Sequence, residues 1–201
     1  QNDLPWPSRR DKVSMIKTLP DSQEALDKQL GSKLRAQINR ANQATITTHI
    51  GHQALVDDFY RVFAINMRDL GTPVYSKAFF ATILEQLGPK HSQLIIIKHN
   101  GVAVSAAFLL GHREMLEIPW ASTLKAANKL SINMFLYRQV LGYAVDNHYQ
   151  FFDFGRSTVD AGTYKFKKQW GAKPVQHYWY YPMSEQQSLP QLNPDNPKFL
   201  L

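Results

Sequence analysis

Four basic side chains lie close together in the last quarter of the sequence. Arg156 follows the apolar run FFDF at 151–154, and Lys165, Lys167 and Lys168 follow within the next twelve positions. Lys165 and Lys168 are three apart, so a helix places them on one side. Clustered cations can bind a phosphate group or stabilise an oxyanion. A solvated basic helix face would have the same spacing, so both interpretations stay open.

Three carboxylates are candidate general bases for an attacking amine. Asp153 interrupts the run FFDF, where a buried carboxylate must be paired or catalytic. Its nearest structural partner in the sequence would be Arg156. Glu117 interrupts the run MLEIPW and is expected to point away from its two apolar neighbours. Asp69 is the third candidate.

Aromatic side chains are frequent in the C-terminal half. They either pack in the core and on the sheet, or they form a stacking wall for a base or a sugar. The residues concerned are Trp120, Tyr164, Trp170, Tyr178, Trp179, Tyr180 and Tyr181.

Metal chemistry is not expected from this sequence. The 7 histidines are scattered, and although His49 and His52 are three apart, no carboxylate completes a ligand set. Cysteine is absent, which excludes disulfides, a thiolate nucleophile and a cysteine-ligated zinc. We therefore expect no metal site.

The composition is that of a globular chain. The 201 residues are 44% hydrophobic and 19% charged, which excludes a disordered tail, a collagen-like chain and a coiled coil. No apolar run approaches the ~18 residues of a membrane helix, so no membrane span is expected. Lys and Arg number 23 against 16 Asp and Glu, and the net charge of +7 fits an anionic partner.

Hydrophobic periodicity predicts which elements position these side chains. Strands are expected at 12–19, 44–49, 94–99, 102–110, 115–120, 151–154 and 175–181. Helices are expected over 22–43, 55–70, 76–88 and 131–146, and from Thr158 or Asp160 to 170. The helix capped by Ser76 is expected to end at Gly88 and to bury Phe79, Phe80, Ile83, Leu84 and Leu87.

The connections between these elements predict a mixed sheet. The Asn100-Gly101 pair between two apolar runs is typical of a type I′ hairpin. The three strands from 94 to 120 are joined by tight turns and should be antiparallel, whereas the last three are joined through helices. An α+β fold with helices on the faces of a mostly antiparallel sheet follows.

The order of elements resembles the GNAT acyltransferase fold. In that fold two neighbouring central strands splay apart and the acyl donor lies between them, which here would be 115–120 and 151–154. Several stretches also resemble the Fem-type peptidyltransferases, in particular the FemAB-like proteins associated with exosortase and PEP-CTERM gene clusters. These stretches are KVSMIKTLP, KLRAQINRA, NMRDLGTPVYSKAFF (66–80), IPWAST (118–123), LSINMFLY (130–137) and FDFGRSTVDAGTYKFKKQWGA (152–172).

The Fem resemblance implies a division of the chain, because members of that group have two tandem GNAT-like domains. Residues 1–43 would hold a linker, the last strand of a missing first domain and a connecting helix. Residues 44–182 would form the GNAT-like acyltransferase domain, and 183–201 a loosely ordered tail.

The resemblance also implies roles for two residues. Phe166 would lie in the substrate channel, and Lys167 would stabilise the acyl-transfer intermediate. With Lys167, Glu117 and Asp153 as catalytic candidates, the expected substrate-binding residues are Arg156, Phe166, Lys165, Lys168, Trp120, Tyr164, Arg35 and Arg40. Arg35 and Arg40 enter with Lys33 as a second basic group that either is solvated or binds an anion.

The segment before the long helix lacks the glycines that a coenzyme A site needs, and this bears on the identity of the acyl donor. GNAT enzymes that use coenzyme A carry a glycine-rich loop before the long helix, whose N–H groups hold the pyrophosphate. Residues 122–130 contain no glycine, although Lys125 and Lys129 can neutralise an anion. This favours aminoacyl-tRNA over acetyl-CoA as the donor.

The leading hypothesis is therefore transfer of an aminoacyl or acyl group to an amine in cell-envelope or polysaccharide metabolism, at a cytoplasmic or membrane-peripheral location. Its anionic substrate would be a tRNA, a nucleotide-sugar or coenzyme A. An acetyl-CoA-dependent N-acetyltransferase and a non-catalytic GNAT-like module that binds an anionic ligand remain as alternatives.

Overall fold

The computed structural model describes residues 4–42 and 45–182. Its strands are β1 (Ser8–Arg9), β2 (Lys12–Thr18), β3 (Ile46–Gly51), β4 (Ser92–His99), β5 (Val102–His112), β6 (Met115–Thr123), β7 (Phe151–Thr158), β8 (Lys173–Gln176) and β9 (Trp179–Tyr180). Its α-helices are α1 (Gln23–Gln29), α2 (Ser32–Asn42), α3 (Val56–Asp69), α4 (Lys77–His91), α5 (Ile132–Asp146) and α6 (Gly162–Gln169). Short 3-10 helices η1 (Gln53–Leu55) and η2 (Lys125–Leu130) precede α3 and α5.

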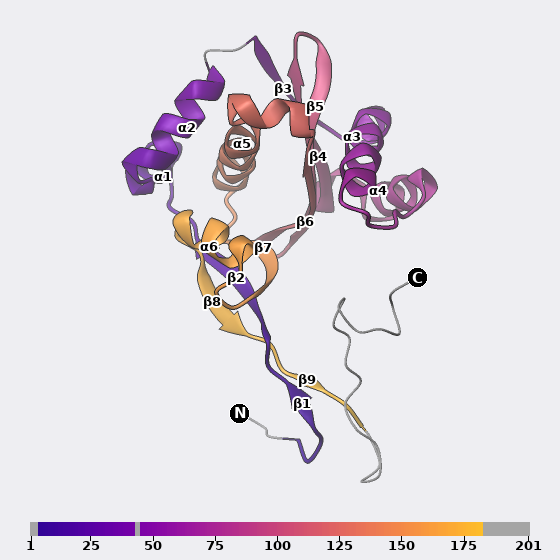
Figure 1. Cartoon of the computed structure of the whole chain (residues 1–201), viewed down its shortest axis with the longest axis vertical. Helices are drawn as coiled ribbons and strands as arrows, with labels where there is room; N and C mark the ends of the chain where they lie inside the picture. The colour runs from indigo at the N-terminus through magenta and orange to yellow at the C-terminus, as the bar shows by residue number, and fades with distance from the viewer. Residues whose placement is uncertain (1–3, 43–44, 183–201) are drawn as a thin grey trace.

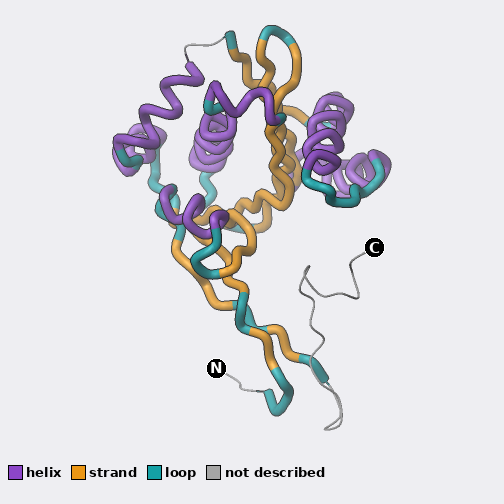
Figure 2. Tube along the Cα trace, in the orientation of Figure 1, coloured by secondary structure: helices purple, strands orange, loops and turns teal. Residues whose placement is uncertain are grey.

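Seven strands form one twisted sheet in the order β3-β4-β5-β6-β7-β2-β8. Helices α1, α2 and α5 lie on one side of it and α3 and α4 on the other, as Figure 1 shows. Figure 2 shows the same layers by secondary structure, with helices on both sides of the strands. All neighbouring strands are antiparallel except β6 and β7, so the predicted mixed, mostly antiparallel sheet is confirmed.

Each face of the sheet buries its own apolar cluster because inward and outward side chains alternate along a strand. Leu116, Phe152 and Met15 point into the cluster beneath α1, α2 and α5. Phe108 points into the cluster beneath α3 and α4.

The predicted hairpin is confirmed. Asn100 and Gly101 connect β4 to β5 with φ values of 50° and 78°. Positive φ at both central residues is what a type I′ turn requires.

The predicted stop at Gly88 is confirmed, because Gly88 has the non-helical angles φ 66° and ψ 172° and α4 is broken by a kink there, with a further helical turn up to His91. The sequence-based boundaries are wrong in three other places. The run 22–43 contains two helices, because Leu30 adopts an extended conformation between α1 and α2. The last helix begins after Ala161, with no side-chain cap from Thr158 or Asp160. The aromatic strand 175–181 is split between β8 and β9.

Burial along α4 also differs from the expectation. Phe80 and Leu84 are buried and Ile83 is half-buried, whereas Phe79 is 38% and Leu87 42% exposed. Leu87 lines a hollow in the surface, and the ring of Phe79 lies 6.0 Å from that of Trp120.

Strands β1 and β9 form a separate two-stranded ribbon that extends away from the body (Figure 1). Strand β2, which the sequence analysis placed at the end of a preceding domain, lies inside the large sheet between β7 and β8. The tail expected at 183–201 lies outside the described residues. Among the described residues, no helix has both the length and the apolar composition needed to cross a bilayer.

Candidate active site

A cleft opens where β6 and β7 diverge. The two strands pair in parallel over only three positions, ending at Glu117 opposite Asp153. β6 then continues to Thr123 and β7 to Thr158 without further pairing between them. The cleft between them has a volume of about 720 Å³. It is the splayed cleft that the sequence analysis placed between 115–120 and 151–154.

A bulge in β7 shapes one wall of this cleft. Ser14 lies opposite Arg156 but Ile16 lies opposite Asp153, so β7 has one residue more than β2 between these pairs. The extra length is taken up at Gly155, whose φ is +79°. A glycine in this region is typical of a bulge, which bends the strand and disrupts its regular ladder.

Lys167 reaches this bulge from α6. Its Nζ donates to the backbone carbonyls of Gly155, at 3.0 Å, and Arg156, at 2.9 Å. An ammonium has three donors, and no third partner of Lys167 occurs among the described residues. Burial lowers the pKa of Lys167 to about 8, an effect that the charge of Asp153 opposes. One N–H of a buried cation is therefore left to bind an oxyanion in the cleft.

Asp153 is held by hydrogen bonds on the floor of the cleft. It accepts from the backbone N–H of Gly155 at 2.7 Å and from Ser14 Oγ at 3.3 Å. Ser14 Oγ is in turn 2.9 Å from His177 Nε2. The pairing considered with Arg156 is wrong, since these two described residues form no ion pair and the guanidinium lies over the Trp179 ring instead, 5.1 Å from its centroid.

Glu117 is the carboxylate best suited to take up a proton. It is half-buried, and its side-chain carboxylate has no hydrogen bond or ion pair within the described part of the chain. Burial raises its pKa, the negative charge of Asp153 raises it further, and Arg156 opposes the shift. A raised pKa brings a carboxylate closer to the range in which a general base works near neutral pH.

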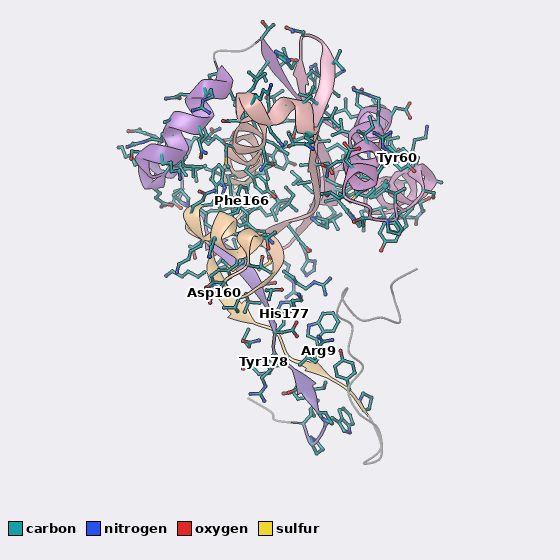
Figure 3. All side chains as sticks on the ribbon, in the orientation of Figure 1. Arg9, Tyr60, Asp160, Phe166, His177 and Tyr178 are labelled. Atoms are coloured by element: carbon teal, nitrogen blue, oxygen red, sulfur yellow. The ribbon has the colours of Figure 1, made fainter. Side chains whose placement is uncertain are left out.

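Aromatic rings line the outer part of the cleft. Trp120 and Tyr75 stand on one side, with ring centroids 6.4 Å apart, and Trp179 stands on the other. Figure 3 shows His177, Tyr178 and Arg9 close together where the ribbon leaves the body. Trp179 therefore contributes to the cleft from the base of the ribbon.

The cleft brings together five of the residues expected from the sequence. Lys167, Glu117, Asp153, Arg156 and Trp120 all line it. Ser14, Tyr75 and His177 were missed as site residues. Ser14 had a signal, because the alternation of KVSMIKT turns it away from Val13 and Met15, but Tyr75 and His177 lie outside regular strands or helices.

The other residues of the helix α6 motif do not line the cleft. Lys165 and Lys168 are exposed to solvent. Phe166 packs against the core, its ring 5.0 Å from that of Tyr137, and Tyr164 lies against the same cluster. None of these four residues lines the cleft, and their contact with a substrate stays a prediction.

Three further candidates lie elsewhere. Arg35 lines a separate hollow of about 270 Å³ between α1, α2 and α5, together with Arg138. Arg40 is exposed on α2. Asp69 pairs with Arg68 at 3.0 Å on the surface. None of the three shares the cleft with Arg156.

Two features bear on cofactors. No group of three or more histidine, aspartate or glutamate side chains in the described ranges is placed to hold a metal ion. The glycine-free segment before α5 forms the 3-10 helix η2, in which the N–H groups of Ala127 and Ser131 are bonded to carbonyls within the segment. Fewer N–H groups are thus left to hold a pyrophosphate there.

A mixed sheet whose two parallel central strands pair over three positions and then part has the architecture of the GNAT fold. The chain belongs to the acetyltransferase (GNAT) domain family, whose sequence profile matches residues 29–168.

Solved structures share this fold at low identity. FemX matches with a TM-score of 0.75 and 13% identity over 90% of this chain and 63% of its own. L-PGS from Bacillus licheniformis matches with a TM-score of 0.71 and 15% identity over 92% of this chain and 63% of its own. The C-terminal domain of a putative lysylphosphatidylglycerol synthetase from Agrobacterium fabrum matches with a TM-score of 0.66 and 13% identity, over 86% of this chain and 60% of its own. The chain thus spans less than two thirds of each, and no curated protein matches its sequence.

Proposed function

We propose that this chain transfers an aminoacyl or acyl group from an activated ester to an amine, in the cleft between β6 and β7. The observation that carries the proposal is the convergence on one cleft of a buried ammonium with a free N–H and a carboxylate with a raised pKa. An acyl transfer needs both groups, one for the oxyanion and one for the proton.

The reaction then follows from these positions. The amine nitrogen attacks the ester carbonyl carbon, and the negative charge on the oxygen of the intermediate is stabilised by Lys167 Nζ. Glu117 takes the proton that the nitrogen loses. The carbon–oxygen bond of the ester breaks, the amide remains, and the leaving oxygen takes up the proton that Glu117 received, which restores the carboxylate.

Arg156 supports an anionic donor. Its guanidinium lies at the mouth of the cleft over Trp179 and is exposed, so it is available to a phosphate. Aminoacyl-tRNA, a polyanion, fits the position of Arg156 and the net charge of +7. It also fits the glycine-free segment that forms η2, because that segment disfavours the pyrophosphate of coenzyme A. The domain of a putative lysylphosphatidylglycerol synthetase, which shares the fold, supports an aminoacyl group as the cargo.

Acetyl-CoA is the second candidate donor. The family profile that matches 29–168 is described as an acetyltransferase domain. Lys125 and Lys129, exposed on η2, would then neutralise the pyrophosphate.

The wider setting is also a proposal. The solved relatives are longer than this chain, which supports a further GNAT-like domain that completes the acceptor site. The resemblance to the exosortase-associated FemAB-like group would place the acceptor in envelope or polysaccharide metabolism. The enzyme would act in the cytoplasm or at the membrane surface.

Binding to the purified chain tests the donor. Calorimetry with acetyl-CoA, a charged tRNA and a nucleotide-sugar is compared between the parent, Lys167→Ala and Lys165→Ala, the last an exposed control on the same helix. We expect tRNA or nucleotide-sugar binding that weakens only in Lys167→Ala. Acetyl-CoA binding that Lys167→Ala leaves intact would overturn aminoacyl transfer in favour of the acetyltransferase. Binding without any transfer to amines would favour the non-catalytic module.

A further inference from the structure

A second hollow lies on the other side of Glu117. It has a volume of about 790 Å³, and Glu117 lines both this hollow and the cleft. Its walls come from the end of α4, the turn between β5 and β6, and the first residues of β6 and β7.

Strand register explains why the two hollows meet at this residue. Across the sheet, Leu110, Glu117 and Asp153 form one row of facing residues, and His112, Met115 and Phe151 form the next. Residues two apart on a strand share a face. The row that holds Glu117 and Asp153 therefore lies between the cleft that Lys167 lines and the row of Met115 and Phe151, which belongs to the second hollow.

The walls of the second hollow are mainly apolar. Leu110, Met115 and Phe151 line its floor, and Leu87 of α4, 42% exposed, lines its side. An exposed leucine beside an apolar floor suits a ligand that buries hydrocarbon or aromatic surface.

The charges favour a cationic head on such a ligand. Among the carboxylates and guanidinium of the lining, Arg113 and Glu114 carry opposite charges and Glu117 adds one negative charge. The imidazoles of His91 and His112 complete the polar part of the lining. Asp153 beside it adds a second negative charge that repels anions. An ammonium next to Glu117 would hold that carboxylate in its ionised form.

We propose that the second hollow is the acceptor subsite, and that it takes a primary amine on an apolar body with its nitrogen directed at Glu117. Donor and acceptor then approach the same carboxylate from opposite sides, the donor through the Lys167 cleft. This inference rests on the proposed acyl transfer, but it is a statement about binding and is tested without turnover.

The probe is 4-phenylbutylamine, with 4-phenylbutanol and 4-phenylbutyrate as matched compounds that lack the ammonium. We expect the amine to bind saturably, the alcohol more weakly and the carboxylate least. Leu87→Ser should raise the Kd of the amine about fivefold or more because apolar contact is lost. Glu117→Gln should raise it about tenfold because the charge partner is lost. Val102→Ser, at the 54% exposed tip of the β4–β5 hairpin, is the matched control and should change nothing.

The outcomes separate the subsite from the proposed reaction. Equal binding of amine and carboxylate, or a Kd that Leu87→Ser leaves unchanged, would overturn the subsite even if the enzyme transfers acyl groups. Selective amine binding that depends on Leu87 and Glu117 but not on Arg156 would support the subsite. That result would stand even if no donor were ever turned over.

Discussion

Glu117 and Asp153 lie directly opposite each other in the last parallel pair of β6 and β7. Beyond this pair the strands separate, so the two carboxylates mark the inner end of the cleft. Asp153 is held by the Gly155 N–H and by Ser14, whereas Glu117 has no such partner among the described residues. The environment thus distinguishes a structural carboxylate from one free to exchange a proton.

The pH dependence of the reaction should follow Glu117 and Lys167. Transfer requires Glu117 ionised, so kcat/KM should rise with pH through a pKa above the ordinary 4.5 of glutamate. Lys167 must be protonated, so the rate should fall above about pH 8.

Two variants test which residue causes each part of this pH profile. Glu117→Gln should remove the rise of kcat/KM at acidic pH (the acidic limb), and Lys167→Met should remove the fall at alkaline pH (the alkaline limb). The acceptor amine has the same pKa in every reaction. At each pH, dividing kcat/KM of the variant by that of the parent therefore leaves only the effect of the enzyme's own titrating groups. An alkaline limb that survives in Lys167→Met would show that another group controls it.

Gly155→Ala should lower both stability and activity. Gly155 has φ +79°, which costs a residue with a side chain about 1–2 kcal/mol. A Cβ there would lie 4.0 Å from Lys167 Nζ, so the penalty comes from the backbone and not from a clash. Relaxation of the bulge would move the two carbonyls that hold Lys167.

The matched control is Gly162→Ala at the start of α6, where a Cβ meets nothing within 4 Å. Its free energy of unfolding, measured by urea denaturation, should stay the same or rise because alanine favours a helix. If Gly155→Ala behaves like Gly162→Ala, the bulge does not depend on glycine.

The aromatic cluster behind Trp120 should be needed for stability. Phe80 is fully buried, with its ring 5.0 Å from Phe59 and 5.1 Å from Trp120. Phe80→Ala should therefore cost about 3–5 kcal/mol of unfolding free energy. Its neighbour Phe79 is 38% exposed, and Phe79→Ala should cost about 1 kcal/mol. Thermal and urea unfolding compare the two, and equal losses would contradict this account of the cluster.

Local patterns in the sequence predicted much of the fold. The Asn100-Gly101 turn and the spacing of apolar residues in α3 and α5 depend on neighbouring residues, so they could be recognised without a structure. Burial on α4 could not be predicted in this way, because Phe79 and Leu87 continue the apolar pattern and yet are exposed, which depends on how α4 packs against the rest of the fold.

The site was predicted where local sequence carried a signal. Asp153 and Glu117 each interrupt an apolar run, and Lys167 lies in the motif that resembles the Fem group. The placement of Lys165 and Lys168 depended on the rotation of α6 against β7, which puts Lys167 inward and its neighbours in solvent. His177 and Tyr75 reach the cleft from segments without regular structure, where no periodicity indicates direction.

The rate of amide formation by Lys167→Met tests the central claim most directly. With whichever donor binds in the calorimetric panel, product is followed by mass spectrometry for the parent, Lys167→Met and Lys165→Met. Loss of one oxyanion donor should lower kcat about 10²–10³-fold in Lys167→Met, with Lys165→Met unchanged and circular dichroism confirming that both fold. A Lys167→Met enzyme as fast as Lys165→Met would contradict catalysis by the ammonium at the β7 bulge.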